Sequence, residues 1–561
     1  MRFILPILCL ALGASSAPIE GRQAGAPSAT VKNGTVIGST TGGIDSFKGI
    51  PFARPPVGPL RLKPPQTITS GYATLTATAV PTACPQFFSQ VDTADLPSDV
   101  IGTLLDSPLG QEILNAGEDC LTLNVIRPST VTSSSKLPVL VYIFGGGFEL
   151  GSTQMYDGTP IVAQSVKLGA PVIYVAMNYR VGGFGFLAGK ELKADGSTNL
   201  GLRDQRLALE WISENIAAFG GDPTKITIWG ESAGAISVFD QTIINGGDNT
   251  HQGKALFRGA IMNSGSITPA LDVDHPKPQA IYDLVVKNAG CSSASDTLAC
   301  LRNLPYQDLL QATNSVPAIF SYTSLNLAYL PRPDPSDSFY PISPDVAVRN
   351  GAYTKVPIIV GDQEDEGTLF SLVQTNITTT EEVVDYFSMI FPDTEVSLTA
   401  GLVDTYPDDP AAGSPFRTGS ANQIYPQFKR VAALVGDVVF NLRRRQYLSL
   451  VSGTVNAWSF LDSHAYGTPV LGTFHASDLL AYFFETTLVT AVTYQNYYVS
   501  FVNYLDPNAI PTTAPLISWP KYTSANPQLV QLQVLSNNLM QDDFRSTSYE
   551  YIVSHPNDFK V

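Results

Sequence analysis

Positive charge is scarce in this sequence. Among 561 residues there are 33 Lys and Arg against 49 Asp and Glu, which gives a formal net charge of −16. Binding to nucleic-acid phosphates needs the opposite sign, so the composition argues against a nucleic-acid partner. Charge of either sign is sparse, at 15% of residues, whereas 44% of residues are hydrophobic. The composition therefore indicates a chain with a large buried core.

Long apolar segments are lacking as well. After the N-terminus, no uncharged apolar segment reaches about 18 residues, which is the length that a membrane-spanning helix needs. No integral membrane segment is therefore expected.

The first residues, MRFILPILCLALGASSA, have the order of a secretory signal peptide. Cleavage after Ser16 is favoured over Ala17, and trimming after Arg22 would make 1–22 a signal peptide with a short pro-segment. An N-terminal anchor is the alternative, but the apolar run is too short for it. The protein is therefore expected to be secreted into the extracellular space.

Cysteines are few, and their number fits an oxidising compartment. Cys9 would leave with the signal peptide, and an even number remains: Cys84, Cys120, Cys291 and Cys300. Two disulfides are expected, and sequential pairing is the simplest of the three connectivities that four cysteines allow. A metal site is disfavoured because no histidine lies near these cysteines. Sequons at Asn33 and Asn376 predict N-glycosylation.

Near-continuous apolar runs recur along the chain. Such runs are typical of strands covered on both faces, which favours a largely parallel sheet with helices on either side. They are residues 136–144, 170–178, 225–230, 258–265 and 356–363. Between the second and third runs, apolar residues recur at helical spacing and end at Gly220-Gly221. The sequence therefore predicts the α/β fold class.

A Gly-x-Ser-x-Gly motif lies where the third run meets a helical pattern. In Gly230-Glu231-Ser232-Ala233-Gly234, the serine would project from a strained strand-to-helix turn as a nucleophile. A structural Gly-Ser turn is the alternative, because the pattern alone is weak at ordinary glycine frequency. The serine would fall at the carboxyl ends of the strands, where open α/β sheets bind their ligands.

A nucleophilic serine also needs backbone N–H groups to receive an oxyanion. The segment YIFGGGFELG (142–151) follows the first run and has consecutive glycines whose amides can approach a substrate closely. A phosphate-binding turn is excluded as an interpretation of this segment, because the Gly-Lys-Ser/Thr ending is absent. A flexible loop is the other alternative. Ala233, directly after the serine, would supply a further donor.

The residues alone leave the base and the acid open. For this fold the order Ser…Asp/Glu…His is expected. Three histidines come late enough, and chemistry does not choose among His464, His475 and His555. The acid candidates cluster at the end of the fifth run, and all but one of them are expected to be structural or solvated: Asp362, Glu364, Asp365 and Glu366.

These motifs together resemble the type-B carboxylesterase/lipase family, which includes cholinesterases. The resemblance spans nearly the whole mature chain and includes EDCLTLNV (118–125), NYRVGGFGFL (178–187) and FGGDPTKITIWGESAG (219–234). Within the family, IFGGGFELG, GDQEDEGTLF and LGTFHASDLL are most similar to secreted fungal lipases and sterol esterases of the Candida rugosa type. Phe144 stands where cholinesterases have histidine, and the fungal lipases share that phenylalanine.

The resemblance implies an α/β-hydrolase fold in a single domain of residues 23–561, with a large, mostly parallel sheet between two layers of helices. It implies Glu366 as the acid and His475 as the base for Ser232, acting through an acyl-enzyme. The implied oxyanion donors are Gly146, Gly147 and Ala233. The implied disulfides are Cys84–Cys120 and Cys291–Cys300. No metal or organic cofactor is required.

The first disulfide loop, about residues 84–120, bears on the substrate. Its segment 96–114 has an apolar helical face and resembles the lid of the fungal lipases, which opens at a lipid–water interface. An ordinary amphipathic helix packed on the body is the alternative. The family also has an acyl tunnel, and Leu369 and Phe370 match positions lining the site there, although core packing is as good an interpretation for each.

The preferred substrate is therefore a long-chain ester of glycerol or sterol. A small-ester carboxylesterase without interfacial behaviour is the first alternative. A non-catalytic adhesion protein is the second, and the presence of Ser232, Glu366 and His475 argues against it. One further hypothesis is a homodimer that pairs through the open lid.

Overall fold

A computed structural model describes residues 25–87, 100–103, 113–484, 489–511 and 516–561. The predicted signal segment and most of the predicted lid lie outside these residues. Of the lid, residues 100–103 are helical, and Val100 is buried in a cluster with Leu369 and Phe370. The disulfides follow the sequential pairing, Cys84–Cys120 and Cys291–Cys300. Asn376 is exposed and Asn33 half-buried, and their glycosylation stays a prediction.

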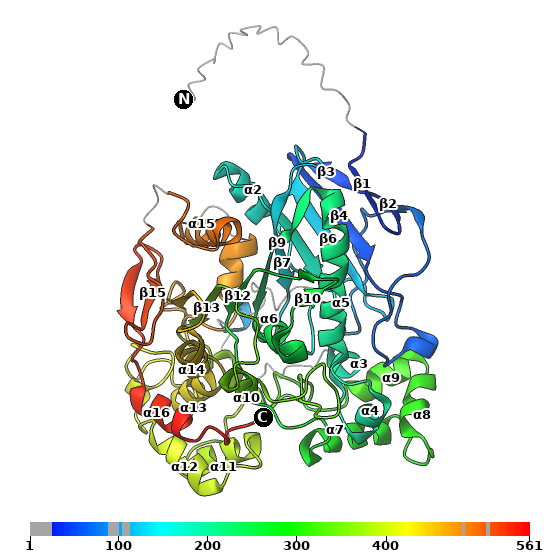
Figure 1. The fold of residues 1–561 in the computed structure, drawn as a ribbon. Helices are drawn as coiled ribbons and strands as arrows, with labels where there is room; N and C mark the ends of the chain where they lie inside the picture. The colour runs from blue at the N-terminus through cyan, green and yellow to red at the C-terminus, as the bar shows by residue number, and fades with distance from the viewer. Residues whose placement is uncertain (1–24, 88–99, 104–112, 485–488, 512–515) are drawn as a thin grey trace, which may run out of the picture.

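An eleven-stranded sheet forms the centre of the described chain (Figure 1). In sheet order its strands are β16 (Asn538–Gln541), β15 (Gln528–Leu532), β14 (Ala457–Asp462), β13 (Ile358–Gln363), β12 (Gly259–Asn263), β9 (Gly221–Glu231), β7 (Leu137–Ile143), β8 (Ile173–Met177), β6 (Thr122–Pro128), β4 (Ile44–Pro51) and β3 (Ser39–Thr41). The five predicted runs contain β7, β8, β12, β13 and the second half of β9, and these segments are almost wholly buried. The predicted α/β fold is confirmed.

Smaller strands and the helices surround this sheet. β1 (Ser28–Val31), β2 (Gly34–Ile37) and β5 (Ala73–Thr76) form a separate sheet, and β10 (Thr250–His251) pairs with β11 (Lys254–Ala255). The helices are α2 (Thr159–Lys167), α3 (Gly182–Phe186), α4 (Lys190–Asp195), α5 (Leu200–Asn215), α6 (Ala233–Ile243), α7 (Pro276–Asn288), α8 (Thr297–Asn303), α9 (Tyr306–Thr313), α10 (Pro344–Arg349), α11 (Thr380–Ile390), α12 (Val396–Asp404), α13 (Phe428–Gly436), α14 (Leu442–Val451), α15 (Val489–Tyr504) and α16 (Ser546–Ser554). Within the described ranges, none of them is both long and apolar enough to cross a bilayer.

Helices cover the sheet on both faces. α2 and α15 pack together against β7 and its neighbours, while α5 and α6 pack on the other side of β9 (Figure 1). The predicted helix before β9 is α5, continued by the 3-10 turn η3 (Ile216–Phe219). It ends at Gly220 with a φ of 85°, a left-handed conformation that glycine adopts at little cost. β9 begins at the next residue.

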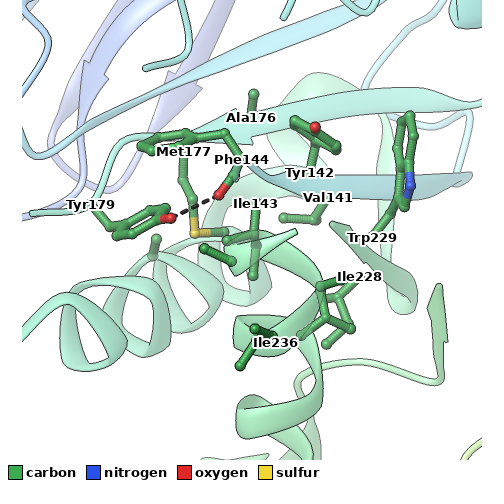
Figure 2. Close-up of a cluster of buried hydrophobic side chains, with 14 of the residues drawn as sticks. Val141, Tyr142, Ile143, Phe144, Ala176, Met177, Tyr179, Ile228, Trp229 and Ile236 are labelled. Carbon is green, nitrogen blue, oxygen red and sulfur yellow. Dashed lines mark hydrogen bonds between the residues drawn. The ribbon is translucent and has the colours of Figure 1, made fainter. Parts of the chain in front are cut away.

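Seven neighbouring strands, β8, β7, β9, β12, β13, β14 and β15, run parallel. Their carboxyl ends therefore meet at one edge of the sheet, and the loops that leave these ends are the ones that carry the predicted site. Aromatic packing fixes the central pair of strands. Tyr142 and Trp229 are register partners whose ring centroids lie 4.6 Å apart, and they face away from Ile228 and Ile236 (Figure 2).

Arg444 on α14 ties the middle of the sheet to its edge. Its Nε donates to Asp362 on β13 at 2.9 Å, and its Nη2 donates to Asp542, directly after β16, at 2.8 Å. Burial opposes ionisation of Asp542, but the charges and hydrogen bonds of Arg444, Arg445 and Tyr522 together outweigh it and hold the pKa of this carboxyl below its usual value. Removing one partner of such a pair leaves an uncompensated buried charge.

We expect Arg444→Met to reduce the free energy of unfolding by about 3–5 kcal/mol, because the buried Asp542 carboxylate then keeps only Arg445 as a charged partner. Urea or thermal unfolding measures this change. Lys225→Met, which removes a half-exposed partner of Asp222, is the control and should cost no more than about 1 kcal/mol. Equal effects of the two substitutions would contradict this role for Arg444.

Candidate active site

Ser232 lies between the end of β9 and the start of α6. Its φ of 58° and ψ of −128° form a strained conformation that non-glycine residues rarely adopt. The Ser232 N–H donates to the Asn263 carbonyl at the end of β12, at 2.9 Å. A Cβ on Gly234 would come within 2.0 Å of the Ile143 carbonyl oxygen, so only glycine fits there. The motif is therefore a strained turn with its side chain at the edge of the sheet.

Two distant loops bring partners to this serine. His475 Nε2 lies 2.7 Å from Ser232 Oγ, and His475 Nδ1 lies 2.5 Å from Glu366 Oε2. The other oxygen of Glu366 accepts the Gln363 N–H at 2.7 Å, which orients the carboxylate. All three side chains are buried. The structure thus joins serine, imidazole and carboxylate in one chain of hydrogen bonds.

The remaining histidines lie elsewhere. His464 Nδ1 is 2.9 Å from Asp462 Oδ2, and His555 Nδ1 is 2.8 Å from the Tyr551 carbonyl. The geometry therefore selects His475 among the three that the residues alone left open.

The other three acid candidates are buried and have structural partners. Asp362 accepts from Arg444, and Glu364 forms a two-pronged pair with Arg417. Asp365 accepts from the N–H groups of Phe416 and Thr473 at 2.7 and 2.9 Å. Burial raises the pKa of Asp365 to about 7. Through Thr473, Asp365 connects the Glu366 loop to the His475 loop.

The triple-glycine loop lies beside Ser232. Gly146 and Gly147 have φ values of 112° and 63°, and both line the pocket that contains Ser232 and His475. Among the described residues, their N–H groups donate no hydrogen bond to the protein. Ala233 is the first residue of α6, a position whose N–H has no partner within the helix. All three predicted donors therefore lie next to the serine.

Both ends of this loop are anchored. The Tyr179 hydroxyl donates to the Phe144 carbonyl at 2.7 Å, and the two rings stack with centroids 4.3 Å apart (Figure 2). At the other end, Gln86 accepts the Gly151 N–H at 2.7 Å and donates back to the Gly151 carbonyl at 3.0 Å. These contacts keep the loop amides at a fixed position.

Two apolar pockets meet at Ser232. The first is lined by Gly146, Gly147, Leu150, Tyr156, Glu231, Ser232, Ile319, Phe320, Leu369, Phe370, His475, Ala476 and Leu479. The second is lined by Gly147, Phe148, Ser232, Ala233, Ile236, Thr268, Ile319, Leu325, Leu327, Leu330, Val439, Phe440 and Val561. Leu369 and Phe370 therefore lie in the first pocket, as expected, and the ring centroid of Phe370 is 5.0 Å from that of His475.

Sequence reasoning missed most of the second pocket. Phe440, whose ring centroid is 4.7 Å from that of His475, comes from a π-helical turn, η7 (Asp437–Asn441). Ile319 comes from a loop and Val561 is the last residue of the chain. No local pattern marks these residues, because each reaches the site only through the tertiary fold.

Comparison with known proteins decides the family. The model of the carboxylesterase family matches residues 25–552. The chain belongs to the carboxylesterase family. The membership predicted from the motifs is thereby confirmed.

Relatives of this carboxylesterase include named fungal lipases. It is 53% identical to Secreted lipase 1 of Botryotinia fuckeliana, covering 100% of this chain and 99% of that one. It is 49% identical to Secreted triacylglycerol lipase LIP1 of Gibberella zeae, covering 97% and 92%. It is 45% identical to Lipase 4 of Diutina rugosa, covering 96% and 98%.

Among solved structures, Aspergillus niger EstA is similar to this carboxylesterase with a TM-score of 0.78 at 27% identity, covering 94% of this chain and 98% of that chain. A PNB esterase gives a TM-score of 0.72 at 28% identity, covering 93% and 99%.

Glu149 connects the glycine loop to its surroundings. Its N–H donates to the Gly146 carbonyl at 3.0 Å, and its carbonyl accepts the Phe87 N–H at 2.9 Å. Its fully buried carboxyl accepts the Ile319 N–H at 2.9 Å. Burial raises the pKa of Glu149 to about 8, against a smaller lowering by the Ile319 N–H. At neutral pH this carboxyl is therefore protonated in the folded protein.

We expect the carboxyl of Glu149 to make stability depend on pH. Between its usual pKa of 4.5 and its raised pKa of about 8, the folded chain holds a proton that the unfolded chain has lost. The free energy of unfolding of the wild type, relative to that of Glu149→Gln, therefore falls by about 1.4 kcal/mol per pH unit as pH rises through this window. Melting temperatures of both proteins, measured across the window, test this. A difference between them that stays constant with pH would contradict the assignment.

We expect Tyr179→Phe to lower kcat about 10-fold with little change in melting temperature, because the Phe144 carbonyl loses its donor and the loop amides lose their position. Initial rates on a soluble ester measure this effect. The control is Tyr497→Phe, which also removes a hydroxyl that donates to a backbone carbonyl at 2.7 Å, away from the two pockets. Equal losses of kcat in the two variants would show that the effect is not specific to the loop.

Proposed function

We propose that this protein is a secreted serine ester hydrolase that cleaves long-chain acyl esters of glycerol and sterols. The single observation that carries the proposal is the hydrogen-bond chain of Ser232, His475 and Glu366, placed where two apolar pockets meet. The hydrogen bonds supply an activated nucleophile, and the pockets supply space for water-insoluble groups.

The proposed reaction has two halves. His475 Nε2 takes the Ser232 proton as Oγ forms a bond to the ester carbonyl carbon, and Glu366 stabilises the imidazolium. The carbonyl oxygen becomes an oxyanion and accepts from the N–H groups of Gly146, Gly147 and Ala233. The alcohol then leaves with the proton from His475, and an acyl-enzyme remains. Water repeats the sequence and releases the acid.

A second carboxyl lies beside the imidazole of His475. Glu231 directly precedes the serine, and its Oε1 lies 3.4 Å from His475 Nε2. Burial, then the charges of Asp478 and Glu366, raises the pKa of Glu231 well above its usual value. The raised pKa favours the neutral form of Glu231, which adds no second negative charge beside the forming oxyanion.

The substrate class is supported by the lining of the pockets. The second pocket consists almost entirely of aliphatic and aromatic side chains, together with Thr268, and it begins at Ser232 and Ala233. We therefore assign the acyl chain to this pocket and the reacting carbonyl to its junction with the first. The relatives named as lipases, one of them a triacylglycerol lipase, support the same class. Sterol ester cleavage rests on the sequence resemblance.

The site of action is proposed to be a lipid–water interface outside the cell. The signal-type N-terminus, the two disulfides and the relatives named as secreted support it. Pairing of two copies through an open lid stays a prediction, because most of the lid lies outside the described residues.

A small-ester carboxylesterase is the second candidate. The likeness to a PNB esterase favours it, because that protein is named as an esterase rather than a lipase. The two candidates differ in substrate and share the same proposed nucleophile.

We expect the wild type to hydrolyse emulsified triolein, cholesteryl oleate and soluble p-nitrophenyl butyrate, and Ser232→Ala to lose at least about 10³-fold in rate on each. Initial rates of the purified proteins test this. Activity on butyrate alone would leave the small-ester carboxylesterase, and a fully active Ser232→Ala would remove Ser232 as the nucleophile.

A further inference from the structure

The turn between β15 and β16 carries two adjacent apolar side chains in solvent. Val534 is 50% exposed and Leu535 is 88% exposed. Leu539, on the edge strand β16, is also exposed. Isolated apolar side chains on a surface need no explanation, but neighbouring ones at the end of a hairpin form a contact patch.

This turn begins at the carboxyl end of β15, and the loops of the candidate active site begin at the carboxyl ends of the neighbouring parallel strands. β15 runs parallel to β14 and β13, with Leu532 opposite Asp462 and Asp462 opposite Gln363. The loops that carry Glu366 and His475 leave from those same strand ends. The Ser463 N–H donates to the Leu532 carbonyl at 2.8 Å, which bonds the start of the His475 loop to the start of the turn. Figure 1 shows β15 on the side of the sheet far from β3.

The chain segment that forms the turn and its two strands carries no charged residue. The sequence from Thr523 to Gln541 contains no Asp, Glu, Lys or Arg, although 15% of the residues of the chain are charged. The polar residues that flank Val534 and Leu535 are Gln, Ser and Asn. An uncharged patch with an apolar tip enters a lipid surface without the cost of desolvating an ion.

The hairpin holds its tip in a fixed position. The Gln533 N–H donates to Asn537 Oδ1 at 3.2 Å, and Asn538 Nδ2 donates to Gln531 Oε1 at 2.9 Å. At its base, Asp542 binds Arg444, and its N–H donates to the Pro527 carbonyl at 2.8 Å. Little conformational freedom is therefore lost when the tip is buried in a partner.

We propose that the β15–β16 turn, through Val534 and Leu535, is a lipid-contact site that holds the enzyme on the surface of its aggregated ester substrate. The proposal rests on the proposed function, because a lipid surface is the physical form of the long-chain esters. No residue of this turn lines either of the two pockets at Ser232. A second copy of the chain is the competing occupant, but two side chains give far less than the roughly 800 Å² per partner of a stable interface.

The test separates adsorption from turnover. In a Ser232→Ala background, Val534→Ser/Leu535→Ser is compared with the unsubstituted background for adsorption to a triolein emulsion stabilised with phosphatidylcholine. The bound fraction is measured by flotation. We expect the double substitution to weaken adsorption about 10- to 100-fold, since two apolar side chains no longer leave water. In the Ser232 background it should leave the rate on soluble p-nitrophenyl butyrate unchanged.

The matched control is Val166→Ser/Tyr504→Ser, which changes side chains that are 48% and 58% exposed. They lie near the amino ends of the parallel strands, whereas the turn lies at the carboxyl ends. Val166 is near the end of α2, just before β8, and Asn503 beside Tyr504 donates to the Ala170 carbonyl before β8. The control should adsorb as strongly as the unsubstituted protein.

Equal adsorption of the turn variant and the unsubstituted protein overturns the proposal, and so does equal weakening by the control. A change in sedimentation from dimer to monomer, without a change in adsorption, assigns the patch to a second copy instead. A protein that adsorbs through this turn but hydrolyses only butyrate retains the lipid contact and fails the proposed function. The two claims therefore fail separately.

Discussion

The strained backbone of Ser232 is the constraint on which the site depends. A serine at φ 58° persists only if its surroundings hold it, and here the Asn263 carbonyl accepts its N–H while Gly234 lies against the Ile143 carbonyl. This close contact between α6 and the end of β7 also brings the triple-glycine loop beside the hydroxyl. The nucleophile and the predicted oxyanion donors are thus positioned by the same contact between two neighbouring strand ends.

Buried charge is the second feature that organises the site. Four carboxyls crowd the end of β13 and the loop after it, and each has a different partner: Asp362 has Arg444, Glu364 has Arg417, Asp365 has backbone N–H groups and Glu366 has His475. The first three fix the loop, so that Glu366 reaches the imidazole in one orientation. Burial raises the pKa values of Glu149 and Glu231, which disfavours a further negative charge on either carboxyl near the serine.

Much of the fold could be read from the sequence, because buried parallel strands leave continuous apolar runs and the serine motif lies at a strand-to-helix boundary. The residues alone could not choose His475 over His464 or Glu366 over Asp365, since both pairs have the same chemistry. The family resemblance made that choice, and the geometry agrees with it. Phe440, Ile319 and Val561 could not be predicted, because periodicity reports that a residue is buried without naming its neighbour. The same limit applied to Glu149, whose role depends on contacts with Phe87 and Ile319.

The most direct test of the account is covalent labelling of the nucleophile. Diethyl p-nitrophenyl phosphate reacts with an activated serine, forming a phosphoester bond and releasing p-nitrophenol. We predict one diethylphosphoryl group per chain, located on Ser232 by peptide mass spectrometry, with complete loss of ester hydrolysis and no label on Ser232→Ala. Stoichiometric label on another residue, or full hydrolysis after Ser232 is labelled, would contradict the central claim.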